Sequence, residues 1–97
     1  MVSVVTRQQD YTQRVLQRIE QHKRYPPSAR RRRITGTVTL ALRLSADGRI
    51  EALNCQRGTP VLCRAAERAA RNAAPFPPLP SGTRHLAFEY RMRFRLH

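Results

Sequence analysis

The sequence predicts a two-layer α+β domain in which two helices cover one face of a three-stranded sheet. Apolar residues recur at helical spacing in two segments and alternate with polar residues in two others, and no stretch has the roughly 20 consecutive apolar residues that a membrane helix needs. The 97 residues suffice for one modest core. We expect one domain over residues 10–97, preceded by a flexible extension over residues 1–9.

The first element is expected to be a helix over residues 10–24. Asp10 and Gln13 have the form of an N-terminal capping box. Tyr25-Pro26-Pro27 ends the helix, because a residue before proline avoids helical backbone angles. Its inward positions are spaced by three or four residues: Tyr11, Val15, Leu16, Ile19 and His22.

Two strands follow, joined by a tight turn. Apolar and polar residues alternate over residues 34–44, with Val38, Leu40, Leu42 and Leu44 on one face. Asp47-Gly48 is a hairpin signal, since glycine accepts the positive φ of such turns. The second strand, residues 49–56, alternates less cleanly.

A second helix and a third strand complete the pattern. Thr59 is expected to cap a helix with Pro60 in its first turn. This helix carries a stripe of small residues, and four prolines between residues 75 and 80 follow it. Residues 86–96 then alternate, with Leu86, Phe88, Tyr90, Met92, Phe94 and Leu96 on one face and Ala87, Glu89, Arg91, Arg93 and Arg95 on the other.

This αββαβ order restricts the topology. The second helix carries the chain back along the sheet, so the third strand runs parallel to the second. It therefore fits beside the first strand, which gives an antiparallel-type sheet of order 2-1-3 with a right-handed crossover. The second and third strands are then the edges.

The charge pattern favours anionic partners without indicating specific nucleic-acid binding. The net charge is +13, carried by eighteen arginines and one lysine. Such a preference for arginine often reflects genome composition. An RNA-binding sheet needs aromatic residues on its open face, but Phe88, Tyr90 and Phe94 share the apolar face. For Arg30 to Arg33 two interpretations stay open, a solvated connection or a docking patch for phosphate, lipid head groups or an acidic protein.

The sequence contains no set of residues with catalytic roles. Its six acids are scattered over helix faces, a turn and strands, and its serines lack a neighbouring base. His22, His85 and His97 lie far apart in the sequence and do not predict a metal site. We therefore expect neither an enzyme nor a cofactor. Cys55 and Cys63 are compatible with a disulfide or with two thiols.

Several motifs in the same order resemble one family over residues 10–96. They are Tyr25-Pro26-x-x-Ala29, Ile34-x-Gly36-x-Val38 and Asp47-Gly48-Arg49-Ile50, followed by Gly58, Leu62, Ala65-Ala66 and Pro75-Phe76-Pro77-Pro78. This series is similar to the periplasmic C-terminal domain of the TonB family of energy transducers. Leu62-Cys63-x-Ala65-Ala66 also resembles the related TolA domain, whose partner cysteine would fall near Val38, where this chain has none. TolA is therefore the second candidate.

The TonB resemblance implies a mechanism. Such a protein is anchored in the inner membrane of a Gram-negative bacterium and is driven by an ExbB/ExbD-type complex through its N-terminal part. Its periplasmic domain grips the TonB box, a short segment of an outer-membrane transporter for iron complexes, haem or cobalamin. Periplasmic oxidation would permit a Cys55–Cys63 disulfide.

An exposed third strand suits this task, because an extended peptide can add to its free backbone groups as a fourth strand. A second copy of the chain could pair there in the same way. The expected contacts on the strand are Ala87, Glu89, Arg91, Arg93 and Arg95, and the resemblance adds His22, Lys23, Arg24, Tyr25 and Pro26. For Tyr25 and Pro26 the alternative role is a helix stop with a packed ring.

Overall fold

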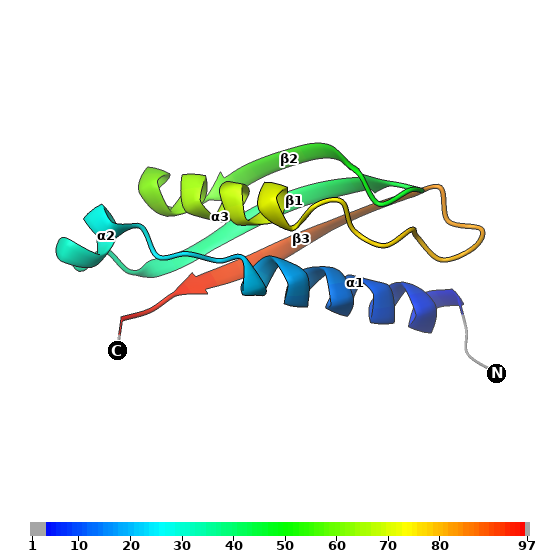
Figure 1. Ribbon diagram of the computed structural model, residues 1–97, viewed down its shortest axis with the longest axis horizontal. Coiled ribbons are helices and arrows are strands. Elements are labelled where there is room, and N and C mark those ends of the chain that lie inside the picture. The colour runs from blue at the N-terminus through cyan, green and yellow to red at the C-terminus, as the bar shows by residue number, and fades with distance from the viewer. Residues whose placement is uncertain (1–3, 97) are drawn as a thin grey trace.

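A computed structural model describes residues 4–96, in which a layer of helices packs on one face of a sheet (Figure 1). The elements, in chain order, are α1 (Val4–Gln21), α2 (Pro27–Arg31), β1 (Gly36–Ser45), β2 (Ile50–Arg57), α3 (Pro60–Ala73) and β3 (His85–Phe94). The α+β class is confirmed.

The sheet has the predicted order, β2-β1-β3, and β1 pairs antiparallel with both neighbours. In Figure 1, α3 lies over β1 and β2, whereas α1 runs along the side of β3. The two edges are therefore β2 and β3, and β3 lies next to the first helix.

The alternating residues of β1 and β3 face the two sides of the sheet as predicted. Val38, Leu40 and Leu44 are fully buried under the helices, as is Met92, and the side chain of Phe94 is only 1% exposed. The odd-numbered side chains of β3 are exposed on the open face.

Strand β2 alternates poorly because its pairing with β1 shifts twice. Thr39 pairs with Arg57 but Leu40 pairs with Cys55, and Arg43 pairs with Ala52 but Leu44 pairs with Ile50. Gln56 and Glu51 are the extra residues at these two irregularities. A β-bulge of this kind interrupts the period of two.

Helix α1 begins at Val4, so the expected start at Asp10 was wrong and residues 4–9 are helical. No glycine or proline precedes Asp10 to stop the helix. The capping-box pattern of Asp10 and Gln13 therefore falls inside the helix, on exposed positions. The inward residues Tyr11, Val15 and Ile19 are buried as expected.

The segment after α1 contains a short helix that was not predicted. Helix α1 ends at Gln21, and α2 begins at Pro27. Proline is also favoured in the first turn of a helix, where its missing N–H is not needed. The Pro26-Pro27 pair therefore both follows one helix and starts the next, which places Arg30 and Arg31 on α2.

Helix α3 begins at Pro60 as expected and ends before the prolines that follow it. The expected apolar stripe is buried at Leu62, Ala66, Ala69, Ala70 and Ala73, whereas Ala65 is half-buried. Thr59 occupies the N-cap position, but its side chain makes no capping hydrogen bond. A guanidinium nitrogen of Arg18 on α1 donates to the carbonyl of Ala73, at 3.1 Å, and to that of Pro75, at 3.3 Å. These bonds connect the two long helices where α3 ends.

The proline-rich segment after α3 docks on the β1–β2 turn. The amide of Phe76 donates to the carbonyl of Gly48, and the amide of Leu79 donates to that of Ala46, both at 2.9 Å. The hydroxyl of Tyr11 donates to the carbonyl of Pro77 at 2.7 Å. Segments far apart in the sequence, α1, the hairpin turn and residues 76–79, therefore meet at one end of the molecule.

Replacing Tyr11 with phenylalanine is expected to lower the free energy of unfolding by about 1 kcal/mol at neutral pH, because the carbonyl of Pro77 loses its donor. Burial raises the pKa of Tyr11 above its ordinary value, and the charge of Arg18 partly opposes this rise. The raised pKa means that the folded chain holds the phenol proton more tightly. The stabilisation is complete below the ordinary tyrosine pKa of about 10 and is lost as the pH rises above it.

Urea unfolding of both proteins at neutral pH and at about pH 10.5 checks this expectation. The difference between wild type and Tyr11→Phe should become smaller at the higher pH. A difference that grows with pH would contradict the assignment.

Candidate peptide-binding edge

Alternate residues of β3 turn their backbone groups away from β1. In an antiparallel strand the N–H and C=O of one residue point to the same side, and those of the next residue point to the other. The carbonyl oxygen of Arg93 accepts a hydrogen bond of 2.8 Å from Nζ of Lys23, a residue just past α1. Since the pairing of β3 with β1 has no shift, the groups of Ala87, Glu89 and Arg91 point outward as well.

The residues of β3 whose backbone groups point away from β1 are therefore the same residues whose side chains lie on the open face. Among residues 4–96, the Arg93 carbonyl is the outward group of this strand for which we find a side-chain partner. An unpaired edge of this kind is a template for another strand. The edge is thus free along its first part and is capped by a lysine near its end.

Lys23 is held at the edge by three contacts. Besides the bond to Arg93, its ammonium lies 3.1 Å from Oε2 of Glu20 and 5.4 Å from the centre of the Phe94 ring. The hydroxyl of Tyr90 donates to the other carboxylate oxygen of Glu20. Glu20 therefore links Lys23 to Tyr90 of β3. Glu20 was not among the residues predicted for the site, although its spacing of three residues from Lys23 is typical of an ion pair on a helix.

A shallow hollow separates α1 from β3 beside this contact. It is lined by Gln13, Leu16, Gln17, Glu20, Gln21 and Tyr90. Leu16, expected in the core, is only half-buried here. A strand added to the edge would point every second side chain toward this hollow and the others toward the open face.

The ring of Tyr25 packs against other residues, as its alternative role in the sequence analysis predicted. Its ring meets that of Phe94 edge-on, with centroids 5.5 Å apart, and its hydroxyl donates to the carbonyl of Ile34. The guanidinium of Arg30 lies 5.8 Å from the Tyr25 ring centre. Tyr25 thus holds the connection between α1 and α2 against the end of β3, and the residue is half-buried.

Another hollow is lined by Tyr25 and by three of the other contacts predicted in residues 22–26. His22, Arg24 and Pro26 line a cavity of about 430 Å³ together with residues of α3, among them Arg64 and Arg68. The structure therefore divides the predicted contacts. Lys23 lies at the β3 edge, whereas its neighbours on either side face α3.

The arginine run forms a basic surface at the end of β3. Arg30, Arg31 and Arg33 line a hollow with Tyr25, Arg95 and Leu96. All four residues from Arg30 to Arg33 are exposed. Arg95 therefore belongs with this surface more than with the free edge.

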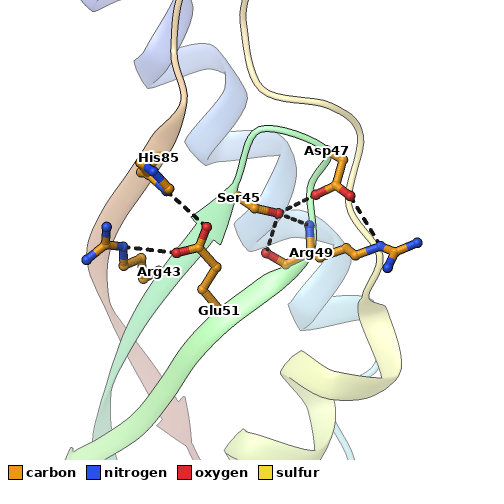
Figure 2. Close-up of polar contacts among 6 residues, drawn as sticks. All are labelled: Arg43, Ser45, Asp47, Arg49, Glu51 and His85. Carbon is orange, nitrogen blue, oxygen red and sulfur yellow. Dashed lines mark hydrogen bonds and ion pairs between the residues drawn. The ribbon is translucent and has the colours of Figure 1, made fainter.

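The opposite end of the open face has its charges paired. Figure 2 shows that Oε2 of Glu51 forms an ion pair with Nε of Arg43 at 3.2 Å and that Oε1 lies 2.9 Å from Nδ1 of His85. In the same view, Asp47 contacts Ser45 and Arg49 within the turn. The hydrogen bond from Ser45, followed by the contacts with Arg49, holds the pKa of Asp47 below its ordinary value although desolvation opposes it.

Cys55 on β2 and Cys63 on α3 are joined by a disulfide in the structure, with Cα atoms 5.7 Å apart. A thiol assay on denatured, unreduced protein should therefore find no free thiol. The double variant Cys55→Ser/Cys63→Ser should lose about 2 kcal/mol of stability, because the unfolded chain is no longer constrained. Two free thiols in wild type would contradict this expectation.

Other chemistries find little support in the described residues. Residues 4–96 contain no group of three His, Cys, Asp or Glu side chains that could hold a metal ion. No helix in this range combines the length and hydropathy of a membrane span. The aromatic residues of β3 lie on the helix side, with Phe94 in the core and Phe88 and Tyr90 packed against it. The open face therefore lacks a base-stacking platform.

Comparison with known proteins gives the family. The family described as "Gram-negative bacterial TonB protein C-terminal" matches residues 21–96. The chain belongs to this TonB C-terminal family. The TonB resemblance of the motifs is thus confirmed in preference to TolA, and this family is a non-enzymatic one.

Individual members of the TonB family agree with this membership. "Protein TonB" of Pasteurella multocida (strain Pm70) is 39% identical over 74 residues, which make up 74% of this chain but only 29% of that protein. The chain thus spans less than a third of this relative. The solution structure of Helicobacter pylori TonB-CTD (residues 179-285) has a TM-score of 0.71 at 27% identity, covering 91% of this chain and 84% of that one.

A further solved structure shares the fold. The structure of HasB CTD has a TM-score of 0.54 at 24% identity and covers 90% of this chain and 70% of that one. At this identity the likeness concerns the fold alone.

Proposed function

We propose that this TonB C-terminal domain is the periplasmic, transporter-binding part of an energy transducer, and that it grips the TonB box of an outer-membrane transporter by adding it as a strand to β3. The observation that carries the proposal is the free edge at Ala87, Glu89 and Arg91, whose N–H and C=O groups point outward. Backbone hydrogen bonds along an edge resist pulling while asking little of the peptide's sequence.

The proposed contact surface combines both groups of residues expected from the sequence. Strand β3 supplies Ala87, Glu89, Arg91 and Arg93, and Arg95 follows just past its end. The segment after α1 supplies His22, Lys23, Arg24, Tyr25 and Pro26. Lys23 already bonds the edge. A peptide that extends past Arg91 would therefore replace the lysine at the Arg93 carbonyl or end beside it.

In this proposal the energy comes from the inner membrane. A preceding N-terminal part anchors the protein there and engages an ExbB/ExbD-type complex, and the domain over residues 10–97 transmits the pull to the transporter. The cargo would be an iron complex, haem or cobalamin. The resemblance of the motifs and the membership in the TonB family support this assignment.

The proposal is tested by titrating the isotope-labelled domain with TonB-box peptides and following backbone amide shifts. Shifts concentrated along residues 85–94 are expected, with smaller ones at residues 22–26. Two protein concentrations control for pairing between two copies of β3. Saturating binding that leaves the amides of β3 unchanged would overturn the proposal.

A further inference from the structure

The charges on the open face are balanced at one end of β3 and unbalanced at the other. At the hairpin end, Arg43 is paired with Glu51. Toward the other end, the exposed side chains of Arg91 and Arg93 make no ion pair with any of residues 4–96. Two unpaired guanidinium groups therefore stand two residues apart on an edge strand.

This spacing is the period of a β-strand. A strand added to β3 places its residues directly opposite Arg91 and Arg93 on the same face, with Cβ atoms about 4.5–5.5 Å apart. The two facing residues are themselves two positions apart, and the residue between them points the other way, toward α1. Guanidinium groups bind carboxylates in planar, bidentate geometry.

The added residue between these two points toward α1, and that side of the edge does not favour a carboxylate. There the edge carries Glu20, which is already shared between Lys23 and Tyr90. An acid pointing toward Glu20 would meet a like charge, whereas an apolar residue would contact Leu16 and the Tyr90 ring in the hollow. The two sides of the edge thus prefer different side chains.

We propose that the β3 edge selects extended peptides that carry carboxylates at two alternate positions, facing Arg91 and Arg93, with an apolar residue between them. This inference rests on the strand addition proposed above. The inference specifies which side chains the bound peptide carries, whereas backbone hydrogen bonds alone do not select its sequence. The pattern, and not merely the negative charge of the peptide, determines the affinity.

Two peptide isomers separate pattern from charge. One seven-residue peptide of threonine, valine and two glutamates has its glutamates at positions 3 and 5, and its isomer has them at positions 3 and 4. Both have the same composition and net charge, so general attraction to this basic chain cancels. At low salt we expect the alternate isomer to bind at least about threefold more tightly, since each opposite-charge pair across strands is worth a few-fold in affinity.

A matched pair of variants locates the effect. Arg91→Glu should abolish the preference for the alternate isomer. Arg57→Glu makes the same change in net charge on the open face, but Arg57 lies on β2 and is separated from Arg91 by Thr39 of β1. This control should keep the preference. Amide shifts recorded in each titration show whether the peptide lies on β3.

The outcomes distinguish this inference from the proposed function. If both isomers shift the amides of β3 and bind equally, or if Arg57→Glu removes the preference as fully as Arg91→Glu does, the inference is overturned and strand addition stands. If neither isomer and no TonB-box peptide shifts the amides of β3, both are overturned. Preference for the alternate isomer, lost only in Arg91→Glu, supports the inference.

Discussion

Replacing Glu89 with proline is expected to weaken peptide binding at least about thirtyfold while the domain stays folded. The backbone N–H of Glu89 points outward, so its loss removes no hydrogen bond between β3 and β1. Proline is tolerated at such edge positions. In a peptide complex, however, the proline ring would occupy the place of the N–H that donates to a carbonyl of the added strand. The complex would lose this central hydrogen bond, a loss of about 2 kcal/mol.

Glu89→Gln is the matched control, because it removes the same charge but keeps the N–H. It should bind within about twofold of wild type, since a single exposed charge contributes little. Thermal unfolding of both variants confirms that the fold is intact. Equal binding by the proline and glutamine variants, measured calorimetrically, would show that the peptide does not use this edge.

Replacing Gly48 with alanine is expected to cost about 3 kcal/mol of stability, through the sum of backbone strain and overpacking. Gly48 has a φ of +86°, a backbone conformation that residues with a side chain rarely adopt. An added Cβ would lie 2.0 Å from the carbonyl oxygen of Phe76. The hairpin turn would have to move away from residues 76 and 77. The hydrogen bond from Phe76 to the Gly48 carbonyl would then be lost as well.

Gly82→Ala separates these two causes. Gly82 has a similar φ of +88°, but an added Cβ would meet no atom within 4 Å. Gly82→Ala should lower the stability by about 1 kcal/mol, because it introduces backbone strain without overpacking. Chemical denaturation of both variants gives the difference, and equal losses would contradict the docking of the proline-rich segment on the turn.

The alternation of residues predicted the sheet well because β1 and β3 are each buried on one face only. Strand order followed from the return of the chain through α3. The helix boundaries were less accurate. A capping pattern such as that of Asp10 and Gln13 is equally acceptable inside an exposed helix face, and a proline pair such as Pro26-Pro27 marks a helix start as readily as an end.

The candidate site was predictable only in part. Alternation placed Arg91 and Arg93 on the open face, and topology made β3 an edge. The contact between Lys23 and Arg93 joins residues 70 positions apart through a long, flexible side chain. Such a contact depends on how α1 packs beside β3, which no local pattern encodes. The role of Glu20 between Lys23 and Tyr90 depends on the same packing.

The central claim, strand addition to the β3 edge, is tested most directly by amide hydrogen exchange with and without a saturating TonB-box peptide. The amides of Ala87, Glu89 and Arg91 point outward and should exchange rapidly in the free domain and at least about tenfold more slowly in the complex. Those of Phe88 and Tyr90 already bond β1 and should change much less. Uniform slowing of all five amides, or no slowing of the three outward ones, would contradict the account.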